Sequence, residues 1–155
     1  MLTHLDEAGL PRMVDVGEKL VTRRTATARA LVRLPEEVRR AIGADGSGGP
    51  KGPVFRTASL AGVMAAKRTS ELIPLCHPLA IEDCRVDVDF DHDGKVRVDC
   101  TVALHARTGV EMEALTGATV AALTVYDMCK ALSHDIVIEE VRLMAKQGGK
   151  RDVGP

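Results

Sequence analysis

Apolar and polar residues alternate in four segments of the chain, and this alternation predicts four β-strands. Residues 21–34 place small alanines on one face, residues 81–90 and 95–104 alternate around valines, and residues 136–145 repeat the pattern near the end. The sequence at 91–94 ends in Asp-Gly, which is typical of a tight hairpin turn. The second and third strands are therefore expected to pair directly.

Helical segments are predicted between these strands. A short helix is expected to open at Pro35 and to end before Gly43, because proline suits a first turn and glycine a helix end. Residues 54–70 form a longer predicted helix with a small-residue face that lets a neighbouring backbone approach closely. A second long helix is predicted over 117–132, and residues 107–117 are expected to be irregular chain or a helix entry.

The order of these elements indicates the fold class. With the two early helices merged into one crossover, the order is β-α-β-β-α-β, the ferredoxin-like α+β pattern of an antiparallel sheet with helices packed on one face. The chain is expected to be one domain over 1–155, with flexible termini at 1–12 and 148–155. Many strand residues are apolar, so we expect the uncovered face of the sheet to be apolar and buried by oligomerisation.

Composition narrows the classes of function. The chain has 155 residues, a formal net charge of −1 and only 2% aromatic residues. This charge gives no global basic field, and few rings are available for base stacking, so no nucleic-acid partner is expected. No apolar run reaches the roughly 18 residues of a membrane span. The polar start of the chain does not resemble a signal peptide, so we expect a cytoplasmic protein with free thiols. No membrane partner and no cofactor are expected.

Two polar pairs suggest chemistry, and each has an ordinary alternative. Cys76 and His77 lie between prolines and fit a nucleophile with its base or a pair of metal ligands, with Cys129 as a third ligand. They equally fit a buried thiol beside a hydrogen-bonded histidine. Glu111 and Glu113 suit the recognition of a guanidine-like edge, but acids in a helix's first turn also stabilise its N-terminus.

The charged residues later in the chain are similarly ambiguous. Asp127 and Lys130 are three residues apart on a predicted helix, so the aspartate can hold the lysine and tune its pKa for proton transfer. An exposed helix ion pair would give the same spacing. Lys51 and Lys146 lie near glycines that suit phosphate approach, and Lys67 ends a helix. Any one of these lysines also fits a solvated surface charge.

Five motifs give the chain a specific resemblance. They are MVDV at 13–16, KGPVF at 51–55, AGVMAAKRTSELIPLCHPL at 61–79, TGVEMEALTGATVAALTVYDMCKAL at 108–132 and KQGGK at 146–150. On these runs the chain resembles the cyclic pyranopterin monophosphate synthase family, accessory protein C of molybdenum cofactor biosynthesis. Two positions depart from the usual pattern of that family. Pro53 stands where an acid is usual, and Arg151 stands where the tail usually has serine.

The resemblance implies an activity and an assembly. It implies a lyase that converts a cyclised dihydroguanosine triphosphate to cyclic pyranopterin monophosphate and releases diphosphate, with no metal. It also implies a homohexamer, built as a trimer of dimers, with active sites at subunit interfaces. The residues matched to the family's catalytic positions are Asp127, Lys51 and Lys130. The residues matched to its substrate-binding positions are Leu75, Cys76, His77, Met112, Glu113, Glu111, Arg24, Lys67 and Lys146.

Other classes of protein stay open on the sequence. One is a non-catalytic ferredoxin-like module that binds a metabolite or RNA, against which the charge and the low aromatic content argue. A second is a metal-binding domain that uses Cys76, His77 and Cys129. A third is a family member without activity, against which the presence of Lys51, Asp127 and Lys130 argues.

Overall fold

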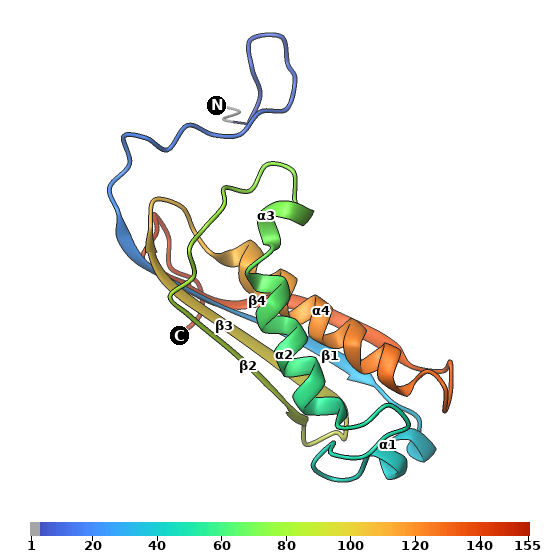
Figure 1. Ribbon diagram of the computed structural model, residues 1–155. Helices are drawn as coiled ribbons and strands as arrows, with labels where there is room; N and C mark the ends of the chain where they lie inside the picture. Colours follow the sequence, from blue (N-terminus) through green and yellow to red (C-terminus); the bar gives the residue numbers. More distant parts are fainter. Residues whose placement is uncertain (1–3) are drawn as a thin grey trace.

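The computed structural model describes residues 4–155 and has a four-stranded antiparallel sheet with helices on one face (Figure 1). The strands are β1 (Thr22–Arg33), β2 (Asp83–Phe90), β3 (Val96–Ala106) and β4 (Val137–Gln147). Their order across the sheet is β2-β3-β1-β4, and every neighbouring pair is antiparallel. The predicted ferredoxin-like fold is confirmed. Residues 1–3 of the expected flexible N-terminal segment lie outside the described part. The helices are α1 (Glu36–Ile42) and α2 (Val54–Ala66) with the short α3 (Thr69–Leu72) between β1 and β2, and α4 (Glu111–Cys129) between β3 and β4.

The two long helices differ from their predicted limits. Helix α4 begins at Glu111, six residues before Gly117, and residue Val110 precedes it without a side-chain cap. A helix start that lacks a capping side chain leaves little trace in the sequence. The helix expected over 54–70 ends at Ala66, and the separate turn α3 follows it. The Thr69 hydroxyl donates to the Ala66 carbonyl at 2.9 Å and helps to close that break.

Small residues let α2 and α4 lie close to each other and to the sheet. The predicted alanine face of β1, Ala26, Ala28 and Ala30, is at most 1% exposed beneath the helices. A Cβ built on Gly62 would lie 3.0 Å from the Gly117 carbonyl oxygen, and one on Gly117 would lie 3.1 Å from the Gly62 carbonyl oxygen. The expected close approach of a neighbouring backbone to α2 is therefore confirmed. The predominantly aliphatic core packs by many small contacts.

The open face of the sheet is polar, so the expectation of an apolar open face was wrong. Arg29 donates to Asp99 at 2.7 Å, and Arg97 lies 3.3 Å from the other oxygen of the same carboxylate. Beside them the hydroxyls of Thr27 and Thr101 lie 2.9 Å apart. Alternate residues of a strand point to opposite faces, so the apolar residues of β1 and β3 face the helices and their polar residues face the open side.

No helix among residues 4–155 is both long enough and apolar enough to cross a membrane.

Candidate active site

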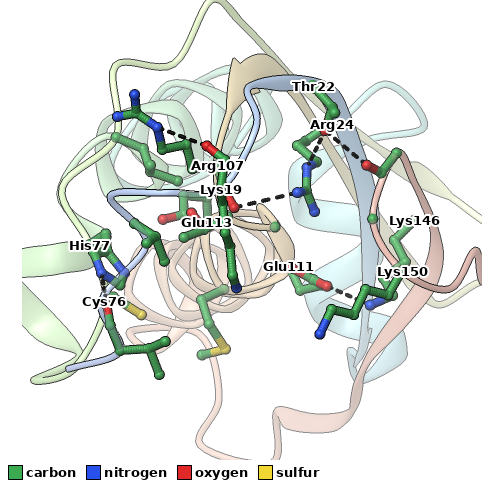
Figure 2. A pocket seen from close by; sticks show the side chains of 18 of the residues that line it. Lys19, Thr22, Arg24, Cys76, His77, Arg107, Glu111, Glu113, Lys146 and Lys150 are labelled. Carbon is green, nitrogen blue, oxygen red and sulfur yellow. Dashed lines mark hydrogen bonds and ion pairs between the residues drawn. The ribbon is translucent and has the colours of Figure 1, made fainter. Parts of the chain in front are cut away.

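A hollow of about 1350 Å³ lies at the end of the sheet where α4 begins. It is bounded by the start of β1, the end of β3, the end of β4 and the first turn of α4, with residues 14–20 and 75–79 around its rim (Figure 2). Four stretches that are distant in sequence therefore contribute side chains to one space: 14–24, 75–79, 107–113 and 146–151. The folding pattern places it there because antiparallel strands β1, β3 and β4 bring these ends together.

An ion pair forms one wall of the hollow. The Lys146 ammonium donates to a Glu111 carboxylate oxygen at 2.8 Å, and each side chain is 29% exposed. Burial disfavours the charged form of Glu111, but the hydrogen bond and charge of Lys146, with Arg24 nearby, outweigh it and lower the pKa of this carboxyl. Glu111 is thus held ionised and fixes the lysine in place.

Glu113 is a buried carboxyl in the same hollow, only 4% exposed. Burial raises its pKa, and the negative charge of Glu111 raises it further. The two glutamates thus differ in their hold on a proton, although they begin the same helix. A carboxyl of this kind can accept N–H donors of a bound ring or exchange a proton with it.

His77 and Cys76 both line the hollow but do not form a nucleophilic pair. The His77 Nε2 atom lies 2.7 Å from the Val14 carbonyl oxygen, so the histidine holds the N-terminal segment at the rim. Burial raises the pKa of the Cys76 thiol, and the charge of Glu113 adds to this effect. A thiol with a raised pKa is a poor nucleophile, so the nucleophile interpretation is not supported.

The structure does not bring together the three metal ligands suggested by the sequence, Cys76, His77 and Cys129. Cys129 is fully buried in the last turn of α4, whereas Cys76 lies beside its first turn. Within residues 4–155, no three histidine, cysteine, aspartate or glutamate side chains gather closely enough to hold a metal ion.

Cations predominate around the hollow, and Lys19 and Arg107 are among those that were not selected from the sequence. Arg107 donates from Nε to the Lys19 carbonyl oxygen at 3.1 Å, and both residues line the hollow. Arg107 directly follows β3, and Lys19 lies in a turn shortly after the MVDV motif. The sequence signal that could have found these two residues is their position, one beside a predicted strand and the other beside a motif of the family. The lining cations are Lys19, Arg24, Arg107, Lys146, Lys150 and Arg151, against the two carboxylates Glu111 and Glu113.

A second charged cluster surrounds Asp127. Its two carboxylate oxygens each lie 3.1 Å from an ammonium, one of Lys51 and one of Lys130. The expected side-by-side placement of Asp127 and Lys130 is confirmed, and Lys51 joins them from the loop before α2. The hydrogen bond from Lys130 first, and then that from Lys51, lowers the pKa of Asp127. All three side chains are about half exposed, so this cluster lies open at the surface.

The two clusters lie at opposite ends of α4. Glu111 opens the helix and Asp127 lies near its end, and a rise of 1.5 Å per residue separates them by about 24 Å along the axis. Eight of the nine expected substrate-binding residues line the hollow, and the ninth, Lys67, is exposed at the end of α2. The three expected catalytic residues are absent from the hollow of their own chain.

Comparisons with known proteins show the family to which the chain belongs. A family model described as the MoaC family matches residues 13–149. A protein of Xanthomonas oryzae pv. oryzae named cyclic pyranopterin monophosphate synthase is 58% identical over 153 residues, 99% of this chain and 93% of that protein. A protein of the same name from Xanthomonas axonopodis pv. citri is 57% identical over the same shares. The chain belongs to the MoaC family.

Proposed function

We propose that this protein is a cyclic pyranopterin monophosphate synthase, a lyase of molybdenum cofactor biosynthesis. It converts (8S)-3',8-cyclo-7,8-dihydroguanosine 5'-triphosphate to cyclic pyranopterin monophosphate and diphosphate. The observation that carries the proposal is the hollow itself, where six cations surround a buried carboxyl at the start of α4. A guanine-derived triphosphate needs both features, a cationic wall for its phosphates and a carboxylate for its N–H edge.

Substrate binding divides between these features. Arg24, Arg107 and Lys146 are held by hydrogen bonds to neighbouring groups, so they present positive charge to the phosphates with little loss of side-chain entropy. Glu113 accepts N–H donors of the ring in its ionised form. His77 stands at the rim, where its ring orders the N-terminal segment beside the bound substrate.

Lys51, Asp127 and Lys130 supply the acid–base chemistry in this proposal. Ring opening and pterin closure require protons to leave one heteroatom and reach another, and two lysines on one aspartate offer an acid and a base. In the phosphate step a sugar hydroxyl loses its proton to a base and its oxygen bonds to the α-phosphorus. The bond from that phosphorus to the bridging oxygen breaks, and diphosphate leaves with the electron pair. Lysines near the leaving group offset its growing charge.

The separation of the two clusters supports an active site that two copies of the chain share. A substrate held by Glu113 cannot reach an Asp127 about 21 Å away along the same helix. A twofold axis that sets two α4 helices antiparallel brings the Asp127 cluster of one copy to the hollow of the other. Leu60, Met64 and Leu123 expose half or more of their side chains on α2 and α4. We propose that such contacts build a homohexamer, a trimer of dimers, and sedimentation analysis that finds only monomer would contradict it.

Turnover of the cyclised substrate tests the proposed activity. Diphosphate release and the oxidised fluorescent pterin are measured for the wild type, Lys51→Ala and Asp127→Ala. General acid–base groups contribute about 10²- to 10⁴-fold, so each variant should lose at least about 100-fold in kcat. Lys95→Ala is the matched control, because it also removes an ion-paired lysine but at the far hairpin, and it should keep turnover.

Two results would contradict the proposal at different levels. Full turnover by Lys51→Ala and Asp127→Ala would refute the catalytic assignment while leaving the activity. No turnover by folded, assembled wild type would refute the activity itself.

A further inference from the structure

The chain turns back on itself after β4 and forms a closed loop at the rim of the hollow. The Lys146 backbone N–H donates to the Val153 carbonyl at 2.8 Å, and the Val153 N–H donates to the Lys146 carbonyl at 2.9 Å. These two bonds close the loop formed by residues 147–152. The loop therefore begins and ends beside Lys146, which already forms part of the wall of the hollow.

Asp152 holds this loop from the inside. Its Oδ1 atom accepts the Gly148 N–H at 3.2 Å. Gly148 has a φ of +91°, and a Cβ at this position would overlap the Arg23 carbonyl oxygen, so only glycine fits the turn. The Gly148 carbonyl accepts the Thr22 hydroxyl at 2.9 Å. The loop is thus fixed both to its own end and to β1.

This fixation determines where two cations lie. Lys150 and Arg151 follow Gly148 in the loop, and both line the hollow; Figure 2 shows Lys150 beside the Lys146–Glu111 pair. The same Thr22 hydroxyl that holds the loop accepts Arg24 Nε at 2.7 Å. A single hydroxyl therefore connects the loop to a cation on β1.

We propose that Asp152 is a positioning residue that holds Lys150 and Arg151 at a diphosphate-binding subsite of the hollow. The proposal rests on the proposed function, since it assigns the phosphate end of that substrate to this side of the hollow. Asp152 acts through its hydrogen bond to Gly148, which reduces the entropy lost when the loop binds an anion. Its negative charge acts in the opposite direction, because it repels phosphate.

These opposing contributions make the proposal testable with two substitutions. Asp152→Asn keeps an oxygen that accepts the Gly148 N–H and removes the charge, whereas Asp152→Ala removes both. Calorimetric titration of the assembled protein with inorganic diphosphate, at fixed ionic strength, should give a Kd for Asp152→Ala about threefold to tenfold above wild type, the range of one net hydrogen bond. Asp152→Asn should bind diphosphate at least as tightly as wild type.

Turnover kinetics and two further variants separate positioning from general destabilisation. In turnover, Asp152→Ala should raise KM by the same factor and leave kcat within about twofold, because it alters binding alone. Asp91→Ala is the matched control, since the Asp91 carboxylate closes the β2–β3 turn by accepting two backbone N–H groups. It should lower Tm without changing the Kd for diphosphate. Thr22→Val releases both the loop and Arg24 from the Thr22 hydroxyl, and it should weaken diphosphate binding even if Asp152→Ala does not fold.

The outcomes distinguish this proposal from the proposed function. Equal Kd values for Asp152→Ala and Asp152→Asn would overturn the positioning role, as would a wild type that does not bind diphosphate. If the Kd values follow the predicted order but the wild type does not turn over the cyclised substrate, the subsite is supported and the proposed activity is contradicted.

Discussion

The contact between Gly62 of α2 and Gly117 of α4 sets the distance between these two helices, and the substitution Gly117→Ala tests this close packing. A Cβ at position 117 would lie 2.6 Å from Cys100 Sγ, 3.1 Å from the Gly62 carbonyl oxygen and 3.4 Å from the Ala66 Cβ. Two of these three neighbours belong to α2 and one to the sheet. The added methyl group therefore presses on both α2 and the sheet, and α4 must shift away from both surfaces.

Two opposing effects set the size of the change. Replacing glycine with alanine inside a helix normally stabilises it by about 1 kcal/mol. Forcing an extra methyl group into a packed core typically costs about 1–3 kcal/mol, and contact with both a backbone oxygen and a buried sulfur places this site at the upper end. The net loss is about 1–2 kcal/mol, which lowers Tm by about 2–8 °C for a chain of this length.

Thermal unfolding at fixed protein concentration measures this loss, since Tm depends on concentration if subunits associate. Cys100→Ala supplies an internal check, because it removes the sulfur that the new methyl group meets. The double variant should lose less stability than the two single variants together, as expected for residues in contact. A Gly117→Ala protein with unchanged or raised Tm would refute the close packing of α4 against α2 and the sheet.

Three further substitutions test the electrostatics of the structure. Glu111→Gln should lower the free energy of unfolding at pH 7 by about 1 kcal/mol. Because Lys146 lowers the pKa of Glu111, this contribution is present above the ordinary pKa of the carboxyl and is lost as pH falls through the lowered value. Urea unfolding of the two proteins should therefore give converging stabilities in acid, and a difference that stays constant with pH would count against this. Glu113→Gln should raise Tm at neutral pH and lower turnover at least about tenfold. Tm should rise because burial raises the pKa of Glu113, so that its ionisation costs stability as pH rises above the ordinary pKa of the carboxyl. A lower Tm would contradict this. Asp99→Ala leaves Arg29 without its partner on the open face of the sheet and should lower the free energy of unfolding, measured in urea, by about 1–2 kcal/mol. Unchanged stability would show that the ion pair contributes nothing.

The fold was predictable because its strands and helices have strong periodic patterns. The alternating alanines of β1 and valines of β3 correctly indicated which residues face the helices. The start of α4 was missed because Val110 offers no capping side chain and Gly117 resembles a helix boundary. Gly117 is instead inside the helix, where the approach of α2 requires a residue without a side chain. Tertiary packing here outweighs local helix propensity.

The site was predictable where its residues are neighbours in sequence, and less so where folding alone joins them. The spacing of Asp127 and Lys130 was enough to expect their contact. The bond between Glu111 and Lys146 joins residues 35 positions apart in the chain, so no local pattern indicates it. The closed loop that ends at Val153 also escaped prediction, because two backbone bonds across the turn form it.

The shared active site is tested most directly by mixing two inactive variants. Lys51→Ala removes a group of the Asp127 cluster, and Glu113→Ala removes a group of the hollow; the two chains are co-expressed with different tags so that they assemble together. If each site takes its hollow from one copy and its lysine from another, random assembly leaves both groups intact in about a quarter of the sites. A site shared between copies should recover about a quarter of wild-type turnover from two proteins that are each inactive. Mixed assemblies that stay inactive, with wild type active in the same assay, would contradict a site shared between copies.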